Sequence, residues 1–137
     1  RLLVAPTYTR EAVLHNPERI AVHLDAAPML DASAEAYSTF DWALHRALTA
    51  ASGSVIYPLM LNGFAGFYER LALIYFQPQE ARHASHAYYG ALGQAAHAAD
   101  ADTAYTLSAS VMRASIDYWR AASASLTQIP LIEDTTP

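Results

Sequence analysis

One long apolar segment constrains the fold of this chain more than any other feature. It spans residues 41–76 and reads DWALHRALTAASGSVIYPLMLNGFAGFYERLALIYF, in a sequence without cysteine. The turn Ser52-Gly53-Ser54 separates two predicted helices, one from about Asp31 to Ala51 and one from Val55 to Phe76. A helix that is apolar on every side is normally buried among other helices. The segment therefore predicts a helical bundle with residues 55–76 as its central helix.

The helix predicted at residues 55–76 is long enough to be mistaken for a membrane span. Glu69 and Arg70 in its interior would each cost roughly 2.5 to 3.5 kcal/mol at the middle of a bilayer, and Pro58 interrupts the run. We therefore expect no membrane partner. Side chains at spacings of three and four form one stripe of this helix: Tyr57, Leu61, Phe64, Tyr68, Leu71 and Tyr75.

Helix-favouring residues dominate the rest of the sequence, and no stretch alternates apolar and polar residues for long enough to form a strand. We predict the all-α class, with about six helices. Pro17 and Pro78 stand where a proline suits the first turn of a helix. The predicted helices run from Arg1 to about Leu14, Asn16 to about Ala27, Asp31 to Ala51, Val55 to Phe76, Gln79 to His97, and Asp102 to Leu126.

The composition excludes several function classes. A length of 137 residues suits one domain, here residues 1–126, followed by a flexible tail at residues 127–137. A net charge of -5, without lysine, argues against nucleic-acid binding by this chain alone. The lack of cysteine excludes disulfides and thiolate catalysis, and no catalytic motif is visible. We expect a cytoplasmic, non-enzymatic fragment of a longer protein, because the chain begins at Arg1 without a signal peptide.

Three segments carry a resemblance to a known family. Residues 41–76, PQEAR at residues 78–82 and SIDYW at residues 115–119 closely resemble the effector domain of FadR-type regulators, the fatty-acid-responsive branch of the GntR family. The similarity extends from Arg1 to Trp119. It implies an all-helical antiparallel bundle that binds long-chain acyl-CoA. In full-length regulators of this type, the bundle follows a winged helix-turn-helix domain that binds operator DNA.

The resemblance also implies how this chain relates to the complete regulator. The winged helix-turn-helix domain is absent here, and the first helix of the effector domain is truncated. Operator DNA would be contacted only through the absent domain, in a homodimer, and acyl-CoA would lower operator affinity. No cofactor is implied.

The ligand-contacting positions of the family fall on Arg1, His45, Tyr68, Tyr75, Tyr89, Met112, Ser115 and Trp119 of this sequence. Six of them match the family in residue type. Met112 replaces a glycine at the mouth of the CoA site, His45 replaces a phenylalanine of the pocket wall, and an arginine expected near Ala109 is absent. The match implies that these residues surround a ligand, and the role of each one is taken from the family by analogy.

By this analogy the acyl chain would lie between the third, fourth and sixth predicted helices. His45, Tyr68, Tyr75 and Trp119 would form its walls. Ser115 and Arg1 would address the pantetheine or the phosphates. Because burial of each methylene contributes about 0.8 kcal/mol, long chains should bind more tightly than short ones.

Two plainer interpretations of the same residues stay open. Buried tyrosines usually find a hydrogen-bond partner without any ligand, so the tyrosine stripe could be ordinary core. Ser115 and Trp119, four residues apart on one helical face, could equally pack against a neighbouring helix. In that case Met112 and the aromatic residues would fill the pocket, and the chain would be a dimerising helical scaffold.

A third alternative is a metal-dependent sensor of a small carboxylic acid, as in related GntR-type effector domains. Asp41 and His45, spaced i and i+4, are the candidate ligands. A protein metal site needs at least three ligands, and the two further positions correspond to Gly90 and Arg113. Glycine offers no side-chain donor and arginine repels a cation, so we expect no metal and a hydrogen bond between Asp41 and His45 instead.

Overall fold

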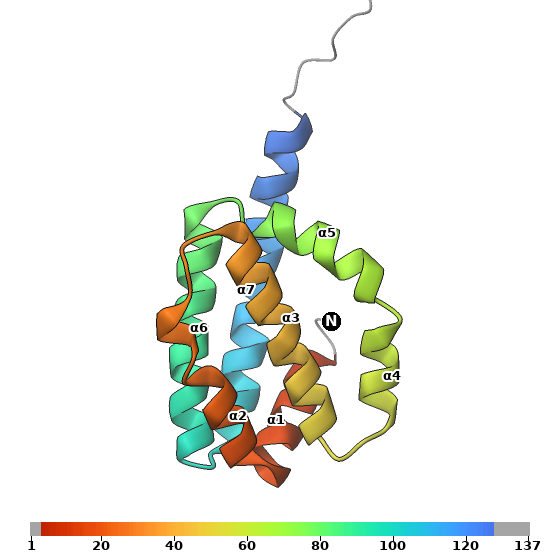
Figure 1. Cartoon of the computed structure of the whole chain (residues 1–137), viewed down its shortest axis with the longest axis vertical. Coiled ribbons are helices and arrows are strands. Elements are labelled where there is room, and N and C mark those ends of the chain that lie inside the picture. Colours follow the sequence, from red (N-terminus) through yellow and green to blue (C-terminus); the bar gives the residue numbers. More distant parts are fainter. Residues whose placement is uncertain (1–3, 128–137) are drawn as a thin grey trace, which may run out of the picture.

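Seven α-helices and one short 3₁₀-helix make up the part of the chain that the computed structural model describes, residues 4–127 (Figure 1). The predicted all-α class is confirmed. In chain order the elements are α1 (Ala5–His15), α2 (Pro17–Leu24), η1 (Ala27–Met29), α3 (Ala34–Ala51), α4 (Ile56–Asn62), α5 (Ala65–Tyr75), α6 (Gln79–His97) and α7 (Ala101–Thr127).

Local signals explain where several helices begin and end. The Ser33 hydroxyl accepts a 3.1 Å hydrogen bond from the Ala36 backbone N–H, so α3 starts three residues later than Asp31. Asn16 precedes α2 without a side-chain capping bond, and its side-chain amide N–H donates to the Ala51 carbonyl at the end of α3. Gly53 turns the chain after α3 with φ of +83°, a conformation that favours glycine.

The helices form a bundle in which α7 runs through the centre, between α1 and α6 (Figure 1). Helix α3 packs on α1, α2 and α5, and α6 packs on α2 and α7. Leu44, Leu48, Tyr89 and Leu92 are fully buried and belong to one continuous core. This arrangement brings α3, α5, α6 and α7 around a common interior region.

The single central helix predicted for Val55–Phe76 is wrong in two respects. The segment forms two helices, because Gly63 and Phe64 make a turn in which the Phe64 N–H bonds to the Leu61 carbonyl. Glycine is a poor residue for a helix interior, costing about 1 kcal/mol relative to alanine. Moreover, α4 and α5 lie at the side of the bundle and not at its centre (Figure 1).

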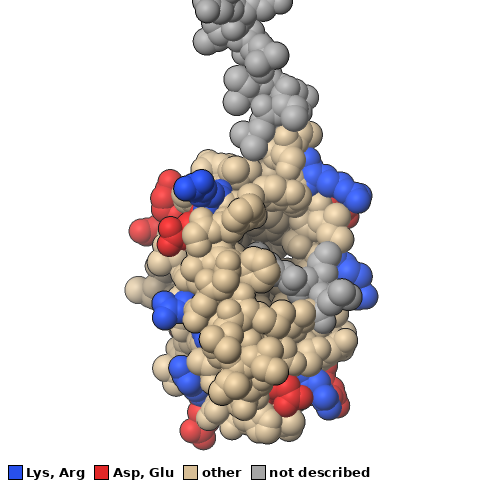
Figure 2. Space-filling view, turned by 90° about the vertical axis from the view of Figure 1, so that its right-hand side faces the viewer, with Lys and Arg blue, Asp and Glu red and all other residues tan. Residues whose placement is uncertain are grey.

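Only one face of α4 and α5 is buried, through Leu61, Tyr68 and Ala72. The opposite face stays exposed although it is apolar, and Phe67 is 71% exposed. Figure 2 looks onto this side of the molecule and shows a broad area without charged side chains, with arginine and acidic residues at its margins. The apolar composition of residues 55–76 therefore reflects an apolar outer face as well as core packing. Its exposed large apolar side chains are Val55, Ile56, Leu59, Met60, Phe64, Phe67, Leu71 and Leu73.

Some expectations fall on residues that the structure does not describe. Arg1 and the tail at residues 128–137 lie outside the described range. Within residues 4–127, no helix combines the length and hydropathy that crossing a bilayer requires.

Candidate functional site

A cavity of about 190 Å³ lies between α3, α5, α6 and α7. Its walls are mostly aromatic and aliphatic, with a few polar groups among them, which is typical of small-molecule sites. The residues that line it are Asp41, Tyr68, Leu71, Ala72, Tyr75, Phe76, Ser85, Tyr88, Val111, Met112 and Trp119. A larger hollow, of about 380 Å³, is bordered by α3 and α4, and it is lined by arginine, polar and aliphatic side chains without an aromatic one among them.

Helical spacing explains how α5 and α7 present their side chains to the cavity. Tyr68 and Ala72 stand four residues apart on α5, and Tyr75 follows three residues later, so all three share one face. On α7, Met112 and Trp119 are seven residues apart and therefore also share a face. The two helices thus supply opposing apolar walls.

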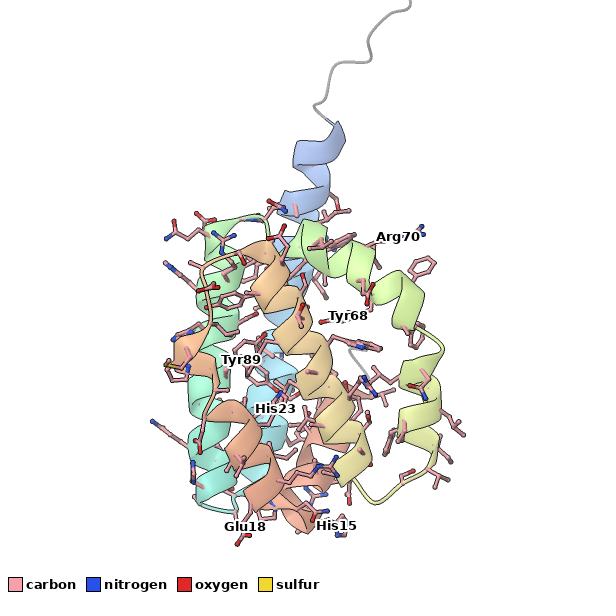
Figure 3. All side chains as sticks on the ribbon, viewed as in Figure 1. His15, Glu18, His23, Tyr68, Arg70 and Tyr89 are labelled. Atoms are coloured by element: carbon pink, nitrogen blue, oxygen red, sulfur yellow. The ribbon has the colours of Figure 1, made fainter. Side chains whose placement is uncertain are left out.

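A buried polar cluster centred on Asp41 borders the cavity. The Tyr89 hydroxyl donates to Asp41 Oδ1 at 2.8 Å, and the Tyr68 hydroxyl donates to Asp41 Oδ2. In Figure 3, Tyr68 lies on the α5 side of α3 and Tyr89 on the α6 side. One carboxyl group therefore joins three of the helices that surround the cavity.

His45 extends this polar cluster to α1. Its Nε2 lies 3.5 Å from Asp41 Oδ2, and its Nδ1 lies 2.5 Å from the Tyr8 hydroxyl. We assign Nδ1 as the acceptor from Tyr8, which places the ring proton on Nε2, facing Asp41. The sequence predicts a hydrogen bond between Asp41 and His45, and the structure places the two side chains next to each other at 3.5 Å, with Tyr8 as an additional partner of His45.

Burial determines the ionisation of Tyr89. The side chain is fully buried, and desolvation raises its pKa well above 10, with a further contribution from the neighbouring Asp41. Tyr89 therefore remains a protonated hydrogen-bond donor across the physiological pH range. A neutral phenol suits the interior of an apolar bundle, where a phenolate would be strongly disfavoured.

The eight residues suggested by the resemblance occupy different places around this cavity. Four of them line it, namely Tyr68, Tyr75, Met112 and Trp119. His45 and Tyr89 contact Asp41 and are not among the lining residues. Ser115 is half-buried and donates a 2.6 Å hydrogen bond to the Met112 carbonyl. Arg1 lies outside the described residues.

Sequence reasoning named Tyr89 on α6 but missed the two residues of α6 that line the cavity. Ser85 and Tyr88 line it from α6, three residues apart on one face. Their signal in the sequence is that both are polar residues on the same face of a correctly predicted helix as the apolar Leu92. Tyr8 offered no comparable signal, since its contact with His45 joins residues 37 positions apart.

Within residues 4–127, no third metal ligand accompanies Asp41 and His45. Among the described residues, no group of three or more histidine, cysteine, aspartate or glutamate side chains could hold a metal ion. Gly90 and Arg113, the positions that correspond to further ligands in related domains, are both exposed. The donors around Asp41 are phenols and an imidazole, and they already occupy its oxygens.

Comparison with known proteins identifies the family. Residues 1–129 match the FadR C-terminal domain. The fatty acid metabolism regulator protein of Shewanella frigidimarina is 44% identical over 86 residues, which are 63% of this chain and 36% of that protein. The regulator of the same name from Edwardsiella ictaluri is 38% identical over 96 residues, 70% of this chain and 40% of that protein. The chain thus spans less than half the length of these relatives, and it belongs to the FadR C-terminal domain family.

Proposed function

We propose that this chain is the ligand-sensing domain of a transcriptional regulator of fatty-acid metabolism and that it binds the acyl chain of a long-chain acyl-CoA in the cavity between α3, α5, α6 and α7. The observation that carries the proposal is the aromatic and aliphatic lining of that cavity. Apolar walls with a few polar groups suit a hydrocarbon chain that carries one polar end. The names of the relatives support a role in fatty-acid metabolism.

In this proposal Tyr75 and Trp119 form walls against which the acyl chain packs. Tyr75 also contacts Tyr118 edge to face, with ring centroids 6.5 Å apart, so its ring is held from the α7 side. Ser115 and Arg1 would address the pantetheine or the phosphates. Binding to operator DNA and assembly into a homodimer belong to the longer protein and are proposed with it.

A pair of substitutions tests the location of the acyl chain. Ala72 is buried in the cavity wall, and Ala72→Leu fills part of the space without adding a polar group. Ala87 is exposed on α6 outside the cavity, so Ala87→Leu is a matched control. Titration calorimetry with palmitoyl-CoA should show at least tenfold weaker binding for Ala72→Leu and no change for Ala87→Leu.

Controls with free CoA complete the test. A thermal shift with acyl-CoA but not with free CoA would support an acyl-chain site, since a ligand that binds only the folded state stabilises it. If no acyl-CoA binds, the chain is better described as a dimerising helical scaffold. If Ala72→Leu binds as tightly as the unmodified chain, the acyl chain lies elsewhere.

A further inference from the structure

The hollow bordered by α3 and α4 also reaches α2, and it shares no lining residue with the cavity proposed for the acyl chain. Three different helices contribute hydrogen-bond donors to it, namely Arg19 of α2, Arg46 of α3 and Asn62 of α4. Thr49 lines it as well, but its hydroxyl donates to carbonyls of its own helix. The groups left to meet a ligand are therefore two guanidinium groups and one amide.

The positive charge in this hollow is not balanced by an acid. No aspartate or glutamate is among the lining residues, although Glu18 is the neighbour of Arg19 on α2. Within residues 4–127, neither Arg19 nor Arg46 forms an ion pair, whereas Arg10 pairs with acidic side chains. Two free cationic groups thus lie in one hollow of a chain whose net charge is -5.

His23 shows that the charge of Arg19 acts on its surroundings. It follows Arg19 by four residues on α2, which places the two side chains on the same face of the helix. The pKa of His23 is lowered by burial and, in addition, by the positive charge of Arg19. A carboxylate paired with Arg19 would offset this repulsion, so the lowered pKa agrees with an unpaired guanidinium group.

These donors suit an anion that carries several oxygens. A guanidinium group presents its N–H groups in a planar fork that matches phosphate oxygens, and a side-chain amide adds a neutral donor. A hollow lined by charges of one sign also raises the local concentration of the opposite ion. We infer that this hollow binds a small oxyanion of the phosphate class, at a site separate from the acyl-chain cavity.

The first test is a titration of the ¹⁵N-labelled 137-residue chain with inorganic phosphate, at constant ionic strength, followed through the arginine Nε–H signals in NMR spectra. Both arginines are exposed, so water and salt compete and the dissociation constant should be on the order of 1 mM. The signals of Arg19 and Arg46 should shift saturably and with the same dissociation constant. Shifts of similar size at all arginines, without saturation, would overturn the inference, because they would show general screening.

The second test compares two substitutions of exposed arginines. Arg46→Gln removes one charge from the hollow and should weaken phosphate binding about fivefold, as followed at the Arg19 signal. Arg113→Gln makes the same change on α7, outside the hollow, and should leave the dissociation constant unchanged. Equal effects of the two substitutions, or no effect of Arg46→Gln, would contradict the assignment. Neither test involves acyl-CoA, so the result is independent of the proposed function.

Discussion

Tyr89 of α6 donates a hydrogen bond of 2.8 Å to Asp41 of α3 in the interior of the bundle. Tyr68 of α5 donates to the other oxygen of the same carboxyl group. These two hydrogen bonds connect α5 and α6 to α3 at the wall of the cavity. The side chains that shape the candidate site also contribute to the stability of the fold, so substitutions there require a stability control.

Substitution of Asp41 should destabilise the bundle strongly. Asp41→Ala leaves the Tyr68 and Tyr89 hydroxyls without this acceptor, and a buried donor that loses its partner costs about 1–3 kcal/mol. We expect urea denaturation to show a free energy of unfolding lower by about 3 kcal/mol. Asp102→Ala, which removes an exposed carboxylate paired with Arg10, should cost less than about 1 kcal/mol. Equal effects of the two substitutions would contradict the role of the buried cluster.

Stability at alkaline pH should depend on Tyr89. Its pKa is raised in the folded state, so above pH 10 the unfolded chain releases a proton from this phenol while the folded chain retains it. The contribution is fully present below pH 10 and is lost as the pH rises towards the folded-state pKa. We expect the free energy of unfolding to fall by about 1.4 kcal/mol per pH unit more steeply than in Tyr89→Phe. Parallel pH profiles from denaturation at pH 8 to 11 would show that this phenol is not buried as described.

The exposed face of α4 and α5 should tolerate truncation. Phe67 is 71% exposed whereas Phe76 is 2% exposed, so the same substitution separates surface from core. Phe67→Ala should change the free energy of unfolding by less than about 0.5 kcal/mol. Phe76→Ala should lower it by about 3–5 kcal/mol. A large loss in Phe67→Ala, measured by chemical denaturation of the same 137-residue chain, would mean that this face is covered.

The end of α6 offers a stabilising substitution. Ala99 has φ of +53°, and the Asp100 N–H bonds to the Ala95 carbonyl, which together form a helix end that normally carries glycine. Because an L-residue pays about 1–2 kcal/mol for this conformation, Ala99→Gly should raise the free energy of unfolding by up to about 1 kcal/mol. Ala98→Gly, at a right-handed position next to it, should lower the free energy of unfolding. Thermal melts of the two variants should therefore shift in opposite directions.

Much of the fold could be predicted from local signals. Helix α6 begins and ends at the predicted residues, Gln79 and His97, because a proline precedes it and its apolar face has a clear period. Residues 55–76 misled the prediction because apolar composition does not distinguish a buried helix from one with an apolar exposed face. The packing of other helices on α4 and α5 is a tertiary property, and a short stretch of sequence does not contain it.

The candidate site was predictable only in part. Tyr68, Tyr75, Met112 and Trp119 line one cavity, as their helical spacing and the resemblance suggested. The contacts of Asp41 with Tyr89 and of His45 with Tyr8 join residues 48 and 37 positions apart. Such pairings depend on how the helices pack, so they could not be derived from periodicity within one helix.

The central claim is that an acyl chain enters the cavity beside Trp119, and tryptophan fluorescence tests it most directly. The chain has two tryptophans, so Trp42→Phe leaves Trp119 as the only indole. We predict that palmitoyl-CoA produces a saturable shift of its emission to shorter wavelengths, whereas free CoA produces none. An emission spectrum that stays unchanged throughout the titration with acyl-CoA, or that changes equally with free CoA, would contradict the account.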